Sequence, residues 1–297
     1  MILWLCISSV LAFLLKASCA NSIFDNSNSN SLESEDSTCS SLCNIPSVWV
    51  ESIEDIIPLG SQPVIYKYQG RRNVELTTDV QKEHIIAEYG KVSVKLTSSN
   101  AYSHGLKTSS LGEYIDGFLD NSSKDVSSAN ANETFYLFGK NEGNFPFTEF
   151  ASMYDLPPNN ISLSEDSYTT IVTGLGGENS GVSFHLHGPG LSESIIGRKR
   201  WFLYSPEYQP IGGFSSLINT TVIEWANSPN FASVERVPSS LSSEPGNSAE
   251  NEQAQRKNKG AFFDCTIAPG EVLYFPSQWM HATLNKDDYN FFVSVFL

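Results

Sequence analysis

The second half of the chain is a succession of short β-strand patterns separated by turns, and this succession restricts the fold most. From residue 169 onward, no stretch has the apolar spacing of a long helix. Strands with turns between them and no long helices predict a sandwich or a barrel. The expected strands are Ile171–Thr173, Val182–His187, Arg200–Tyr204, Gly270–Phe275, His281–Leu284 and Phe291–Leu297.

One segment interrupts this series of strands. Between residues 239 and 260 the only large apolar side chain is Leu241, and Ser, Glu, Asn and Gln are frequent. Such a composition cannot bury enough apolar area to offset the entropy lost on ordering. We therefore expect residues 239–260 to be a disordered insertion between two core strands, dispensable for stability.

The first half of the chain mixes strands with helices. Apolar residues at helical spacing, ended by Gly90, predict a helix over Thr78–Tyr89. Together with the strands of the second half, this pattern indicates a mainly β fold with flanking helices. The other expected elements are helices at Glu54–Leu59 and Ser110–Leu119 and strands at Pro63–Tyr68, Val92–Leu96 and Phe135–Phe138.

Three of the five histidines suggest a metal site. His185 and His187 are two residues apart, so on a strand they would point to the same face. On this spacing alone, a pair of surface histidines is the commoner explanation. A third histidine, His281, follows Phe275-Pro276 at the start of another expected strand and could complete a three-imidazole site.

Three motifs together resemble the JmjC domain. They are Phe184-His185-Leu186-His187-Gly188-Pro189-Gly190, Gly197–Tyr204, and Gly270–Pro276 with Trp279, His281 and Asn285. The resemblance extends over residues 45–297. It implies a double-stranded β-helix, the jelly-roll fold of cupins, that binds Fe(II) through His-X-Asp/Glu…His and also binds 2-oxoglutarate. His185 and His281 match the two histidine ligands.

The resemblance also implies residues for 2-oxoglutarate. Lys199 follows His185 by 14 residues and matches the lysine that binds the far carboxylate in the family; a solvated strand lysine is the alternative. Tyr136 is a weaker candidate for the same carboxylate. Both assignments come from the family and not from spacing.

His187 departs from the family pattern, because it occupies the position of the Asp or Glu ligand. Three neutral imidazoles leave a divalent ion with its full charge and suit Zn, Ni and Cu, so we expect Zn or Ni to bind more tightly than Fe. Glu193 could supply a carboxylate ligand instead. Gly188-Pro189-Gly190 interrupts the strand pattern before it, so the sequence does not predict to which side the Glu193 side chain points. Metal affinity should fall as the pH drops through about 6.5, since imidazole must be neutral.

The N-terminus suggests a route into the secretory pathway. Residues 1–20 have an apolar run and the Ser18/Ala20 spacing of a cleaved signal peptide, with an uncleaved anchor as the alternative. Residues 21–44 are Ser-, Asn- and acid-rich and are expected to form a disordered leader. The mature chain should have no membrane span and lie in the endoplasmic reticulum lumen, or be secreted. Possible glycan sites are Asn121, Asn132, Asn160 and Asn219.

Charge and cysteines narrow the function further. The formal net charge is −15, which disfavours nucleic-acid binding through phosphates. Three cysteines follow the signal peptide, so at most one disulfide forms. Cys39 and Cys43 could pair locally, or all three thiols could lack a correct partner; Cys265 is the third.

Two functions remain open. The first is an Fe(II)/2-oxoglutarate-dependent hydroxylase acting on a protein substrate in the lumen, supported by Lys199 and the outer histidines. The second is a catalytically degenerate JmjC protein that acts through protein partners as an interaction or signalling regulator, supported by His187. A cupin that binds sugar or another ligand is a third, weaker alternative.

Overall fold

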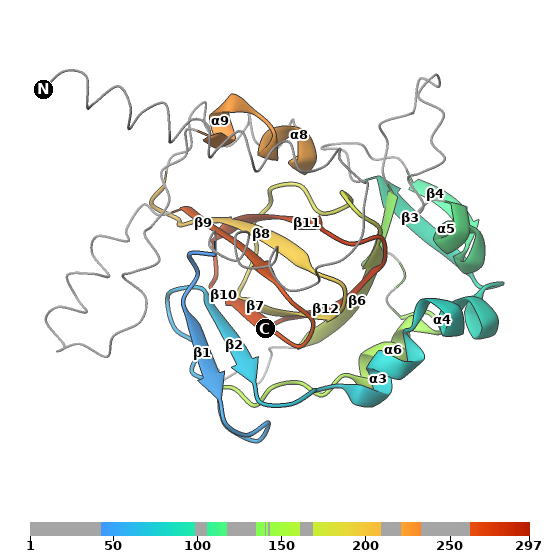
Figure 1. The fold of residues 1–297 in the computed structure, drawn as a ribbon, viewed down its shortest axis with the longest axis horizontal. Coiled ribbons are helices and arrows are strands. Elements are labelled where there is room, and N and C mark those ends of the chain that lie inside the picture. The colour runs from blue at the N-terminus through green and yellow to red at the C-terminus, as the bar shows by residue number, and fades with distance from the viewer. Residues whose placement is uncertain are drawn as a thin grey trace, which may run out of the picture. The chain divides into compact units, whose positions relative to one another are not determined.

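The computed structural model describes residues 43–98, 106–117, 135–139, 141, 143–160, 169–208, 221–232 and 262–297. The expected signal peptide 1–20, the leader as far as residue 42 and the insertion 239–260 lie outside these residues. The described strands form two sheets (Figure 1). None of the helices in the described ranges is long and apolar enough to cross a membrane.

The larger sheet has nine strands, and neighbours in it come from distant parts of the chain. β10 lies between β2 and β7, and β12 lies between β7 and β6. All its pairs are antiparallel except β1 with β2. In sheet order the strands are β1 (Ser47–Val50), β2 (Val64–Tyr68), β10 (Val272–Phe275), β7 (Gly190–Ile196), β12 (Asn290–Phe296), β6 (Thr170–Gly176), β5 (Phe135–Phe138), β3 (Ser93–Ser98) and β4 (Leu106–Ser110).

The smaller sheet contains β11 (Met280–Asn285), β8 (Lys199–Tyr204) and β9 (Phe262–Ile267). Its inner face packs on the larger sheet, since the Trp201 ring on β8 stacks on Phe275 of β10 with the ring centroids 5.4 Å apart. This two-sheet, crossed-over arrangement is the expected jelly-roll, cupin-like fold. The apolar cluster between the sheets includes Ile65, Trp201, Leu203, Phe263, Ile267, Leu273 and Phe275.

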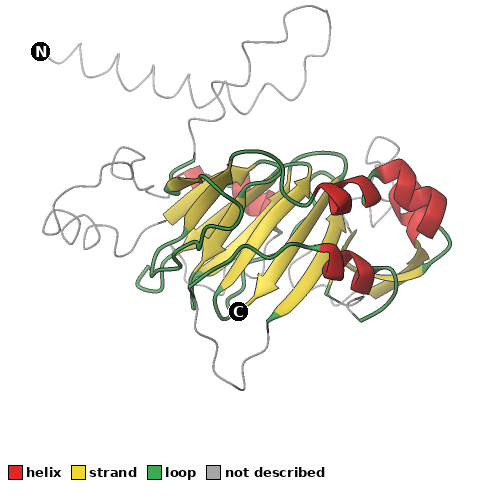
Figure 2. Ribbon diagram, turned by 90° about the horizontal axis from the view of Figure 1, so that it is seen from below, coloured by secondary structure: helices red, strands yellow, loops and turns green. Residues whose placement is uncertain are grey.

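Helices cover the outer faces of the sheets. Four lie near one end of the larger sheet (Figure 2) and contribute to its outer apolar cluster: α3 (Val74–Asp79), α4 (Lys82–Tyr89), α5 (Leu111–Gly117) and α6 (Phe147–Met153). Phe291 and Val293 of β12 belong to the same cluster. On the smaller sheet, α8 (Val222–Ala226) and α9 (Pro229–Ala232) place Trp225 and Phe231 against Phe202.

Two expected helices differ from the structure. Residues 54–59 form no helix, because the Ile57 N–H donates to the Pro158 carbonyl oxygen and Ile57 forms a β-bridge with Asn159. The predicted helix over Thr78–Tyr89 is two helices, since α3 ends at Asp79 and α4 begins at Lys82. Gln81 has extended backbone angles at the start of α4, which separates the two.

The strand prediction was wrong around the first two histidines. Residues 182–187 form no regular strand, and the one β-bridge described there joins His185 to His281. The regular strand is β7, which begins at Gly190, after the irregular Gly188-Pro189 segment, and the sequence did not predict it. The side chains of β7 do not show the usual alternation of apolar and polar residues. Ser192 and Ser194 face the space between the sheets, and Glu193 is a charged residue buried on the outer face of the larger sheet.

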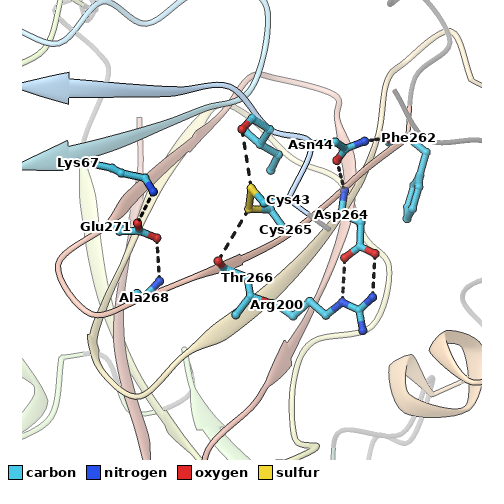
Figure 3. The surroundings of a disulfide bond; sticks show 11 residues. Cys43, Asn44, Lys67, Arg200, Phe262, Asp264, Cys265, Thr266, Ala268 and Glu271 are labelled. Carbon is cyan, nitrogen blue, oxygen red and sulfur yellow. Dashed lines mark hydrogen bonds and ion pairs between the residues drawn. A yellow bond between two sulfur atoms is a disulfide. The ribbon is translucent and has the colours of Figure 1, made fainter. Parts of the chain in front are cut away.

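A disulfide joins the start of the described chain to the smaller sheet (Figure 3). Cys43 is bonded to Cys265 of β9, so both alternatives from the sequence, a local pair of Cys39 with Cys43 and three thiols without a correct partner, are wrong. Asn44, assigned to the leader from sequence, is buried and bonds the backbone of Phe262 and Asp264 at 3.0 and 2.7 Å. The loop closed by the disulfide spans 222 residues. In the chain-entropy description, closing such a loop stabilises the fold by about 5 kcal/mol.

Candidate metal centre

The three predicted histidines converge. The potential ligand atoms of His185, His187 and His281 all lie within 4.8 Å of one another. The ring centroid of His281 is 4.3 Å from that of His185 and 4.8 Å from that of His187. Three imidazoles so close can hold one ion in common.

Backbone contacts between two distant segments bring the rings together. His281 lies on β11, and its backbone exchanges two hydrogen bonds with that of His185, at 2.9 and 3.0 Å. The Gln278 N–H donates to the His187 carbonyl oxygen at 3.0 Å. Gln278 has a φ of 65°, in the left-handed region that residues with a side chain rarely adopt. The turn before β11 therefore positions both His187 and His281.

Each imidazole is oriented by a carbonyl oxygen. Nδ1 lies 2.7 Å from the Ser183 oxygen in His185, 2.8 Å from the Gly188 oxygen in His187, and 2.7 Å from the Trp279 oxygen in His281. A carbonyl oxygen only accepts, so in each ring Nδ1 carries the proton. The Nε2 lone pair is then available for a metal, which is the usual arrangement around histidine ligands.

Burial keeps the three imidazoles neutral. It lowers the pKa of His185 to about 4, lowers that of His187, and lowers that of His281 well below its usual value. With the pKa values lowered in this way, we expect metal affinity to fall at a pH below 6.5. Neutral imidazole, the form that binds a metal, persists to lower pH.

Aromatic rings surround the histidines. Phe296 lies 4.8 Å from the His187 ring, Phe275 lies 4.7 Å from His281, and Trp201 lies 5.7 Å from His281, all between centroids. Within the described ranges, the potential ligands grouped here are the three histidines alone. Neutral nitrogen donors in an apolar setting suit Zn, Ni or Cu and also accept Fe(II).

Glu193 does not belong to this group, so the suggested carboxylate ligand is wrong. It faces outward from β7, where Tyr154 Oη donates to it at 2.9 Å and Asn73 Nδ2 at 3.1 Å. The Arg72 guanidinium lies 3.6 Å away. Strand alternation explains the difference, because Glu193 is the neighbour of inward-facing Ser192 and Ser194.

Lys199 is buried at the start of β8. Its Nζ lies 3.0 Å from the centre of the Phe292 ring on the opposite sheet. Across the described ranges we find no hydrogen bond or ion pair to this ammonium. Burial lowers the pKa of Lys199 well below its usual value, and the lysine in turn contributes to lowering the pKa of His185. An anion that entered this region could pair with the Lys199 ammonium.

Tyr136 lies on β5, opposite Gly176 of β6. Burial raises the pKa of its phenol to about 12, so the phenol is neutral and can donate a hydrogen bond. No described contact joins Tyr136 to Lys199. The nearest link is indirect, because Phe138 on the same face of β5 lies 5.5 Å from Phe292, between centroids.

The sequence interpretation missed three residues of the site: Gln278, Phe292 and Phe296. Phe292 and Phe296 are four residues apart on the last strand, which identifies a shared face but not what that face contacts. Gln278 gives no signal, since only the backbone angles reveal its position. The sequence could not separate aromatic residues of the site from ordinary core residues.

Known proteins support the assignment that the geometry suggests. The chain is 38% identical to JmjC domain-containing protein 8 of Mus musculus over 220 residues, covering 73% of this chain and 67% of that protein. It is 36% identical to the Homo sapiens protein of the same name over 219 residues, covering 73% and 69%. A shorter match, 30% over 126 residues, covers 38% of this chain and 11% of the lysine-specific demethylase JMJ21 of Arabidopsis thaliana. No protein-family model matches the chain. From the first two relatives, the fold and the three histidines, the chain belongs to the JmjC domain family and is similar to JmjC domain-containing protein 8.

Proposed function

We propose that this protein is a metal-dependent JmjC oxygenase that uses 2-oxoglutarate to hydroxylate a protein in the lumen of the secretory pathway. One observation carries the proposal. A buried lysine, which has no anionic partner among the described residues, lies on the same inner face as three histidines whose Nε2 atoms are available. A buried charge is costly unless it is paired, so such a lysine is typical of a ligand site.

Each group has a distinct role in this proposal. His185, His187 and His281 hold the divalent ion, and the carbonyl bonds at Nδ1 keep the rings in their ligating orientation. Lys199 pairs with the far carboxylate of the co-substrate. Phe275, Phe296 and Trp201 exclude water around the histidines. When bound, Fe(II) supplies the oxygen-activating chemistry of the family.

A second candidate rests on His187. With imidazole in place of a carboxylate, a bound divalent ion keeps its full charge and iron activates oxygen less readily. In this alternative the protein is catalytically degenerate and acts as an interaction or signalling regulator of protein partners in the endoplasmic reticulum. Zn or Ni would then be the tightly bound ion.

The experiment combines elemental analysis, 2-oxoglutarate binding and turnover for four proteins: wild type, His187→Asp, Lys199→Ala and the double variant. The oxygenase proposal predicts turnover in wild type with Fe(II), a higher rate in His187→Asp, and none when Lys199 is removed. Tight zinc binding with no turnover in either wild type or His187→Asp would favour the degenerate candidate. No metal in any variant would contradict both.

The luminal location is part of the proposal. The Cys43–Cys265 disulfide supports an oxidising compartment. Of the four possible glycan sites, Asn160 is the one within the described residues, and its side chain is exposed. Endoglycosidase should increase the mobility of the protein from cells, and Asn160→Gln should remove part of that shift. A cytosolic protein unchanged by the enzyme would contradict the location.

A further inference from the structure

The Lys199 ammonium is covered by an aromatic ring. Phe292 of β12 lies with its ring centre 3.0 Å from Nζ, and both side chains are buried. A cation over the face of a phenyl ring is attracted by the ring's quadrupole, more strongly when water is excluded. The ring therefore occupies one direction from which a carboxylate could approach Nζ.

The fold makes room for this ring at one place. Gly174 of β6 is paired with Phe292, and a Cβ added there would lie 2.2 Å from Phe292 Cζ. Phe138 lies beside the same ring. Glycine at position 174 thus permits a large ring beside the lysine, where any other residue would displace it.

The ring also lies toward the lysine end of the inner face of β12. Phe296 on this face contacts His187, and Phe292 contacts Lys199. Residues four apart on a strand are separated by about 13 Å. Between them lies Ser294, whose Oγ is 3.3 Å from Ser192 Oγ. A ligand extending from the histidines to the lysine would pass Ser294 and meet Phe292.

We propose that Phe292 is a cap on Lys199 that determines which carboxylate ligands reach the ammonium. To pair its far carboxylate with Nζ, 2-oxoglutarate must displace the ring, so the cap weakens binding of 2-oxoglutarate. Shorter carboxylates that bind near the histidines without reaching Nζ leave the ring in place. The cap follows from the contacts alone. Its effect on 2-oxoglutarate rests on the proposed function.

Chemical reactivity of Lys199 tests the cap without any co-substrate. Reductive methylation with formaldehyde, followed by mass spectrometry, measures access to Nζ. Phe292→Leu and Phe292→Ala should raise the methylation rate of Lys199 by about tenfold or more, because the cation–π contact is lost. Phe291→Leu is the matched control, since Phe291 is a buried ring on the opposite face of the strand, against Phe150.

Phe291→Leu should leave the rate for Lys199 unchanged. Equal rates in wild type and both Phe292 variants, with folding verified by circular dichroism, would overturn the cap. Faster methylation in Phe291→Leu as well would assign the effect to general loosening and also overturn it.

Calorimetric binding of 2-oxoglutarate and of the smaller oxalate then separates the two proposals. The cap predicts a lower Kd for 2-oxoglutarate in Phe292→Leu than in wild type, and little change for oxalate. Faster methylation with no 2-oxoglutarate binding in any variant would retain the cap and reject the co-substrate. Binding of 2-oxoglutarate to wild type, with methylation and affinity unaffected by either Phe292 substitution, would retain the co-substrate and reject the cap.

Discussion

Glu193 and Lys199 are buried charged residues only six positions apart, but they lie on opposite faces of the sheets. Glu193 points outward and is surrounded by Arg72, Asn73 and Tyr154. Lys199 points inward, where its contact is the Phe292 ring. The fold itself explains the buried charge of Glu193, which has polar partners. The buried charge of Lys199 has no counter-ion among the residues that the structure describes, and this indicates a ligand. The comparison locates the candidate site on the inner face.

The largest expected effect is a difference in the free energy of unfolding between a variant that removes the partner of Glu193 and a variant that removes Lys199. Arg72→Met leaves the Glu193 carboxyl buried without its cation and should lower the free energy of unfolding by about 3–5 kcal/mol. Lys199→Met removes a buried charge that has no counter-ion in the described part of the chain, so it should change the free energy of unfolding by less than about 1 kcal/mol or increase it. Urea denaturation of both variants measures the difference. Equal losses would show that Lys199 is as structural as Arg72.

A smaller effect concerns metal. Zinc at a hundred times its Kd should stabilise the wild-type protein by about 2.7 kcal/mol, because it binds the folded chain. His281→Ala should abolish this stabilisation, while Glu193→Gln should keep it. Thermal denaturation with and without zinc checks both. Loss of the zinc effect in Glu193→Gln would mean that the outer network supports the metal centre.

The smallest expected effect is the pH dependence of the free energy of unfolding that arises from His185. Burial lowers the pKa of His185 from 6.5 to about 4. Between pH 6.5 and pH 4 this imidazole is therefore protonated in the unfolded chain but neutral in the folded chain. Stability from this group is complete above pH 6.5 and is lost as the pH falls toward 4, by about 1–3 kcal/mol. Urea denaturation from pH 7 to 4 measures the loss, and His185→Leu should reduce it. An unchanged slope in that variant would place the titration elsewhere.

Much of the site was predictable because it depends on residue type. The three histidines came from residue spacing together with the family resemblance, Lys199 came from the resemblance, and the sandwich or barrel class came from the turn-separated strands. The bridge between His185 and His281 was not predictable, since it forms between segments 96 residues apart. The strand that follows, β7, was missed because its buried outward residue is a glutamate.

The cysteines show the same limit. Local spacing left a pair of Cys39 with Cys43 open, but the chain at Cys43 runs beside β9, where Cys43 is bonded to Cys265. Asn44 then bonds the backbone of the same strand. Proximity in space decides which thiols meet, and sequence spacing does not report it.

The sequence by itself determined the chemistry that is possible: three imidazoles, a lysine at the family spacing and enough strands for a jelly roll. Only the tertiary structure decided which groups meet. It tied each Nδ1 to a carbonyl oxygen, placed Glu193 outside, and set Phe292 over Lys199. The physical reason is that a buried polar group takes its properties from its neighbours, and those neighbours come from distant strands.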